Sequence, residues 1–211
     1  MPGFNSTMYI SNDFKELIQR GNKYEDYVLE IMNLSRTTFP NRYYKINKQS
    51  NGEPDFKECS SDKPFDAKLV FSTLQGKKLC GENDVVVFFE EMVKQNNSMH
   101  DSIINETSDI SELTSLLKRH LEKPTTQGKN IIFFFTFPIG APVTSSIAFF
   151  LIQDMLAQAL SSLSPFTNGR EIYGICPTLD DHYEIRKIDS PDPEFVHYTK
   201  LDKYFKWSMG K

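Results

Sequence analysis

The sequence predicts an α/β (α+β) fold in which helices flank a mixed central β-sheet. Three observations favour this class: an amphipathic helical pattern over residues 12–35, a run of short strands over residues 43–71, and a continuous apolar segment, IIFFFTF, at residues 131–137. The apolar segment lies between two further helical patterns, over residues 110–122 and 144–162. A helix, a strand meander and then a buried strand between helices are typical of helices packed on a sheet.

Chain length and composition indicate one globular domain. The 211 residues are enough for one sizeable core, so we predict a single domain over residues 1–211, with a short N-terminal extension (1–11) and an aromatic and basic C-terminal tail from about residue 190 to 211. The longest apolar runs are far shorter than the ~20 residues of a membrane-spanning helix. No basic start leads into an apolar segment, and we therefore expect a cytoplasmic protein without membrane contact.

Cysteine, histidine and charge content exclude several classes of site. Cys59, Cys80 and Cys176 are widely separated and show no CxxC spacing, which argues against a zinc site and a disulfide framework. The four histidines have no metal-ligand spacing. The net charge of −4 provides no general attraction to a phosphate backbone, so nucleic-acid binding would require a local basic surface.

The individual elements follow from local patterns. Asn12 is a suitable N-cap for the first helix, which we expect to end between residues 35 and 40. Residues 82–95 mix strand and helix signals, and the polar residues 96–109 are interpreted as a loop. Strands are expected at residues 43–47, 55–57, 65–71, 131–137, 171–176 and 183–188.

The strand at residues 65–71 contains an unexpected acid and lysine. Side chains alternate along a strand, so Asp66 and Lys68 share one face while Phe65 and Ala67 share the other. Asp55 lies eleven residues before Asp66, and the short loop between the two strands would allow them to pair antiparallel. We therefore expect two carboxylates and one ammonium group to converge at the sheet surface.

Glu25 is the third acid of interest, because it lies in the apolar stripe of the first helix, one turn after Gly21. A buried carboxylate needs a cationic partner or a hydrated site. Two interpretations of Glu25 follow: a role in a functional site, or a structural ion pair with a cation such as Arg42 or Lys45.

Together these residues, Gly21-x-x-x-Glu25, Pro54-Asp55 and Asp66-x-Lys68, resemble the motifs of the PD-(D/E)XK nuclease superfamily. The resemblance covers roughly residues 12 to 72 by motif, and the apolar strand with its following helix is similar to the rest of the family core. It implies a restriction-endonuclease-like core with a mixed central β-sheet flanked by helices.

The resemblance also implies a catalytic site. Asp55, Asp66 and the backbone carbonyl of Ala67 would provide oxygen ligands for Mg²⁺, with Mn²⁺ as a substitute. Lys68 would orient or deprotonate the attacking water, and Glu25 would act as a ligand directly or through water. One-metal and two-metal chemistry both remain open.

Several further residues are candidates for supporting roles. Glu53 and Glu58 flank Asp55 and are alternative ligands, although Asp55 has the better position. Substrate phosphates would be contacted by polar and basic residues near the motifs, namely Gln75, Lys45, Lys48, Lys77 and Lys78.

The function that the resemblance implies is a Mg²⁺-dependent endonuclease that hydrolyses DNA phosphodiester bonds, in preference to RNA, in a restriction or phage-defence system. A homodimer or a partner subunit would supply target recognition. The alternative is a catalytically inactive module that uses the same fold for binding or as a scaffold in a nucleic-acid-associated complex. A third interpretation, an unrelated protein with a chance Asp-x-Lys triplet, requires that the strands at residues 54–57 and 65–71 do not pair.

Overall fold

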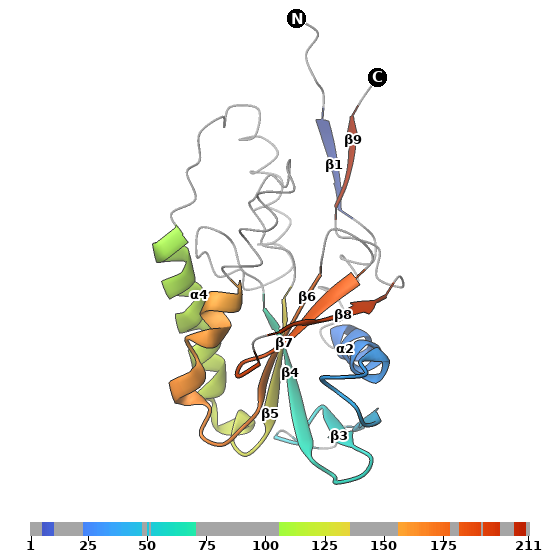
Figure 1. Cartoon of the computed structure of the whole chain (residues 1–211), viewed down its shortest axis with the longest axis vertical. Coiled ribbons are helices and arrows are strands. Elements are labelled where there is room, and N and C mark those ends of the chain that lie inside the picture. Colours follow the sequence, from blue (N-terminus) through green and yellow to red (C-terminus); the bar gives the residue numbers. More distant parts are fainter. Residues whose placement is uncertain are drawn as a thin grey trace, which may run out of the picture.

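The protein has a mixed α/β architecture in which a seven-stranded curled sheet has helices on both faces (Figure 1). The computed structural model describes residues 6–10, 23–47, 50, 52–70, 106–135, 156–177, 182–190, 192–198 and 205–209.

In chain order, the elements within these ranges are β1 (Ser6–Ile10), α2 (Lys23–Leu34), β2 (Tyr43–Lys45), β3 (Phe56–Glu58), β4 (Pro64–Val70), α4 (Glu106–Leu121), η1 (Pro124–Thr126), β5 (Asn130–Phe135), a helical segment at 156–161, η2 (Ser164–Phe166), β6 (Ile172–Pro177), β7 (His182–Lys187), β8 (Glu194–His197) and β9 (Phe205–Met209).

The main sheet combines parallel and antiparallel pairing in the order β2-β3-β4-β5-β6-β7-β8. The central strands β4, β5 and β6 are parallel, while β2 and β3 on one side and β7 and β8 on the other pair antiparallel. Parallel neighbours need a crossover connection, and the described helices α4 and 156–161 lie in the two crossovers. A separate two-stranded ladder joins β1 to β9 near the chain ends (Figure 1).

Two apolar cores hold the helices against the sheet. On one face α2 packs, through residues such as Val28 and Met32, over the β4 residues Phe65 and Ala67. On the opposite face α4 and residues 156–163 cover the other side of β4 and β5, with Leu113, Leu117, Leu121, Leu160 and Leu163 against Val70, Ile131, Phe133 and Phe135. The alternation predicted for the strand at residues 65–71 is therefore confirmed for its described part.

Most predicted elements are confirmed within the described residues, with one shifted boundary. The six predicted strands correspond to β2, β3, β4, β5, β6 and β7, and the first helix ends at Leu34, one residue before the range predicted for its end. The predicted helix start at Asn12 and the segment at residues 82–95 lie outside the described residues. The loop prediction for residues 106–109 is wrong, because α4 begins at Glu106; this polar stretch, ETSD, carries the acidic and hydroxyl side chains that favour a helix N-terminus.

Glu194 in β8 connects the last strand of the main sheet to the segment after α2. Its Oε2 accepts hydrogen bonds from Ser35 Oγ at 2.6 Å and from the backbone N–H of Thr38 at 2.7 Å, and its Oε1 accepts one from the N–H of Arg36 at 2.7 Å. Burial alone would raise the pKa of Glu194, but these hydrogen bonds outweigh burial and lower the pKa to about 2 from its ordinary value of 4.5. The ionised carboxylate therefore stabilises the fold.

We expect Glu194→Gln to lower the free energy of unfolding at neutral pH by about 2 kcal/mol, because hydrogen bonds to a charged group are among the stronger ones. The folded-state pKa lies below the unfolded value, so this stabilisation is complete above pH 4.5 and is lost as the pH falls toward about 2. Urea unfolding at several pH values measures the effect. Glu122→Gln, at an exposed glutamate that immediately follows α4, is the control, and equal stability of the two variants at pH 7 would contradict the role of Glu194.

Candidate functional site

The β3–β4 hairpin places Asp55 and Asp66 in contact. Phe56 pairs with Phe65, so extending this antiparallel register by one residue places Asp55 opposite Asp66. The backbone N–H of Asp55 donates to Asp66 Oδ1 at 3.3 Å, and both acids are buried, with 1% and 3% of their surfaces exposed. The predicted antiparallel pairing is confirmed. The third interpretation, an unrelated protein with a chance Asp-x-Lys triplet, requires that these two strands do not pair, and they do.

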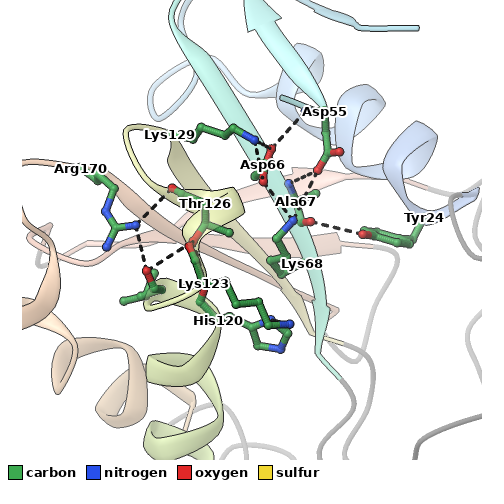
Figure 2. Close-up of polar contacts among 11 residues, drawn as sticks. Tyr24, Asp55, Asp66, Ala67, Lys68, His120, Lys123, Thr126, Lys129 and Arg170 are labelled. Atoms are coloured by element: carbon green, nitrogen blue, oxygen red, sulfur yellow. Dashed lines mark hydrogen bonds and ion pairs between the residues drawn. The ribbon is translucent and has the colours of Figure 1, made fainter. Parts of the chain in front are cut away.

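The peptide of Ala67 lies between the two acids and α2. Its N–H donates to Asp55 Oδ2 at 2.7 Å, and its carbonyl oxygen accepts a hydrogen bond from the Tyr24 hydroxyl at 3.2 Å (Figure 2). Burial raises the pKa of Tyr24, and the carboxylates of Asp55, Glu25 and Asp66 raise this pKa further. The phenol therefore stays protonated and donates to the Ala67 carbonyl over the physiological pH range.

Lys68 reaches both acids, as predicted from its position two residues after Asp66. Its Nζ lies 3.1 Å from Asp66 Oδ2 and 4.0 Å from Asp55 Oδ2, while 21% of the side chain stays exposed. One ammonium group therefore faces two buried carboxylates and also has access to solvent.

Lys129 is a member of the cluster that the sequence interpretation missed. It immediately precedes β5, and its Nζ lies 3.3 Å from Asp66 Oδ1 and 3.4 Å from Asp66 Oδ2 (Figure 2). The sequence of residues 123–130, KPTTQGKN, favours a turn, and no local spacing links this turn to Asp66. The parallel pairing of β4 with β5, in which Asp66 is opposite Ile131, makes the contact. The formal charges of Asp55, Asp66, Lys68 and Lys129 cancel.

Glu25 has a different partner from the two aspartates. It is buried in α2, and its Oε2 lies 3.2 Å from Lys45 Nζ, which also lies 2.7 Å from Asp26 Oδ1. Burial would lower the pKa of Lys45, but its hydrogen bonds to Asp26 and Glu25 outweigh burial and raise it. Of the two interpretations of Glu25, this geometry matches the structural ion pair, and the proposed phosphate contact of Lys45 would compete with it.

The remaining candidates add no ligand to the cluster. Glu58 is buried and accepts hydrogen bonds from Asn41 and Ser61, while Glu53 accepts one from the N–H of Ser50 at 3.3 Å. Among the described side chains, no group of three or more histidine, cysteine, aspartate or glutamate residues is placed to hold a metal ion. The predicted substrate-binding residues Lys48, Gln75, Lys77 and Lys78 lie outside the described residues.

Comparison with known proteins does not assign the site. The chain matches no protein-family model, no curated protein and no solved structure. In the part of the chain that the structure describes, no helix has both the length and the apolar character needed to cross a membrane. The functional interpretation therefore depends on the chemistry of the cluster itself.

We expect Asp66→Asn to lower the free energy of unfolding by about 3 kcal/mol, because removing one member of a buried ion pair leaves its partners without compensation. Chemical denaturation followed by circular dichroism measures the change. The matched control is Asp62→Asn in the same hairpin, where the carboxylate is exposed and a change below about 0.5 kcal/mol is expected. An Asp66→Asn variant as stable as this control would show that the ion pairs of Asp66 with Lys68 and Lys129 do not contribute to the free energy of unfolding.

Proposed function

We propose that this protein is a metal-dependent endonuclease of the restriction-endonuclease-like fold. Asp55, Asp66 and Lys68 form the site at which it hydrolyses DNA. The observation that carries the proposal is the hairpin register, which places two buried aspartates side by side and within 4.0 Å of the ammonium group of one partly exposed lysine. The mixed sheet with helices on both faces also agrees with the core that the sequence motifs imply.

The donor set fits a hard divalent cation. Mg²⁺ binds through one or two carboxylates and keeps its remaining positions for water and substrate phosphate oxygens. Asp55, Asp66 and the Ala67 carbonyl offer such oxygen donors on neighbouring backbone segments, and Mn²⁺ takes the same ligands. A bound metal would supply positive charge against the negative charge that develops on the phosphoryl oxygens during hydrolysis.

Each protein group has a distinct task in this proposal. Lys68 faces both acids and solvent, so its ammonium can contact a scissile phosphate or orient the attacking water. The Ala67 N–H holds the Asp55 carboxylate, and Tyr24 holds the Ala67 carbonyl. Tyr24 is a positioning residue, because it acts through the backbone at Ala67 and contacts no reacting atom.

The biological setting is part of the same proposal. DNA is the substrate in preference to RNA, and a restriction or phage-defence role follows the sequence resemblance. Because the cluster of two acids and two lysines carries no net formal charge, it does not repel a phosphate group. A homodimer or a partner subunit would provide target recognition.

We expect the purified protein to cleave DNA in the presence of Mg²⁺ or Mn²⁺, and chelation with EDTA to stop the reaction. Asp66→Asn and Lys68→Met should each lower the cleavage rate by at least about a hundredfold, because each removes charge from the reacting centre. A gel assay with single-stranded DNA, double-stranded DNA and RNA measures the rates and the preference.

Matched controls separate the site from general effects of charge. Asp62→Asn changes an exposed aspartate in the hairpin and Lys57→Met changes a lysine in β3, so both should cleave at the wild-type rate. Cleavage that persists in Asp66→Asn and Lys68→Met would exclude this centre, provided that circular dichroism shows both variants folded.

A second candidate function is a binding or scaffold module that uses the fold without hydrolysis. The observation in its favour is that Lys68 and Lys129 already neutralise the buried acids, so the cluster can stabilise the sheet without a metal. This candidate predicts DNA binding that does not depend on Mg²⁺ and is not followed by cleavage.

A further inference from the structure

Lys129 lies where a cation bound to Asp66 would be expected. Its Nζ is nearly equidistant from the two carboxylate oxygens of Asp66, at 3.3 and 3.4 Å, so it faces the open side of the carboxylate. The side chain is 9% exposed and that of Asp66 is 4% exposed. Lys129 is therefore a buried cation held against an oxygen pair that could also coordinate a metal ion.

The other contacts of Asp66 distinguish Lys129 from Lys68. Asp66 Oδ1 accepts the N–H of Asp55, and Oδ2 accepts a hydrogen bond from Lys68, while Lys129 contacts both oxygens. A carboxylate has about four acceptor positions. A metal ion that coordinates Asp66 would therefore compete with Lys129 for either carboxylate oxygen.

The two lysines also differ in their freedom to serve the reaction. Lys68 is on the same strand as Asp66, reaches toward Asp55 and is the more exposed of the two. Lys129 immediately precedes the neighbouring strand β5, 63 residues after Asp66 in the chain, and its side chain is more deeply buried. Lys68 is suited to contact substrate, whereas Lys129 is suited to remain paired with the Asp66 carboxylate.

We propose that Lys129 is a built-in competitor of the metal: its ammonium occupies the Asp66 carboxylate and must be displaced before a divalent cation binds there. This inference rests on the proposed function, because it concerns the same metal centre. The buried ammonium raises the metal concentration at which the centre fills, since two positive charges a few ångströms apart repel each other strongly in a site of low polarity. At low concentrations of divalent cation the metal centre therefore stays without a metal ion.

The test compares Mn²⁺ binding to wild type and to Lys129→Met by isothermal titration calorimetry without DNA. Methionine keeps an apolar stem of similar length and removes the charge. We expect the dissociation constant for Mn²⁺ to fall by at least about tenfold in Lys129→Met, because the repulsion and the competition are both removed. Lys129→Arg keeps the charge, so its affinity should stay within about threefold of wild type on the same reasoning.

Controls assign the change to the Asp66 carboxylate. Lys118→Met removes one positive charge from a lysine that lies over Phe166 and pairs with Glu122, and should leave Mn²⁺ affinity unchanged. Asp66→Asn in the Lys129→Met background should abolish the gain. Thermal unfolding checks that each variant is folded, and Lys129→Gln, which keeps a hydrogen-bond donor, replaces Lys129→Met if that variant does not fold.

The outcomes separate this inference from the proposed function. Equal or weaker Mn²⁺ binding by the neutral variants, beside measurable binding by wild type, overturns the competition and leaves the metal centre in place. A gain that survives Asp66→Asn also overturns it. If neither wild type nor a neutral variant binds Mn²⁺, both the competition and the metal centre of the proposed function are wrong.

Discussion

The pairing of β3 with β4 is the constraint on which the rest of the site depends. It places Asp55 and Asp66 side by side, with the backbone N–H of Asp55 donating to the Asp66 carboxylate, and both acids are almost fully buried. Two neighbouring negative charges that are buried in this way would oppose folding if they had no positive partners. Lys68 and Lys129 supply those partners, and because Lys129 precedes β5, the same charges connect the antiparallel part of the sheet to its parallel part.

The two faces of β4 divide the structural and chemical tasks. Phe65 and Ala67 pack under α2, while Val70 joins the core beneath α4 on the opposite face. The polar residues Asp66 and Lys68 share the α4 face with Val70, near the beginning of β5. A strand anchored by apolar packing on both faces can hold charged groups in a defined position, which a flexible loop would do less well.

The same four charged groups account for both functional candidates. Without a metal, two acids and two lysines form a neutral cluster that can stabilise the sheet. With a metal on the acids, the lysines become additional positive charges suited to a phosphodiester. In the proposed nuclease a divalent cation would replace the Lys129 ammonium at Asp66, whereas a scaffold would keep both lysines on the acids.

Local sequence determined the hairpin and its two acids. The alternation of side chains in the strand at residues 65–71 assigned Asp66 and Lys68 to one face, and a short loop made the antiparallel contact with Asp55 predictable. The helical period likewise placed Glu25 on the buried stripe of its helix, although it left the partner of that carboxylate open.

The packing of distant elements determines which distant lysines pair with these acids. Lys129 reaches Asp66 because β4 and β5 pair in parallel across a connection of more than fifty residues, and no sequence spacing specifies that register. Lys45 reaches Glu25 because α2 packs beside β2. Strand alternation and helical period act over a few residues, whereas ion pairs between distant segments depend on how whole elements pack. This packing gives Glu25 the partner Lys45 and gives Asp66 the partner Lys129.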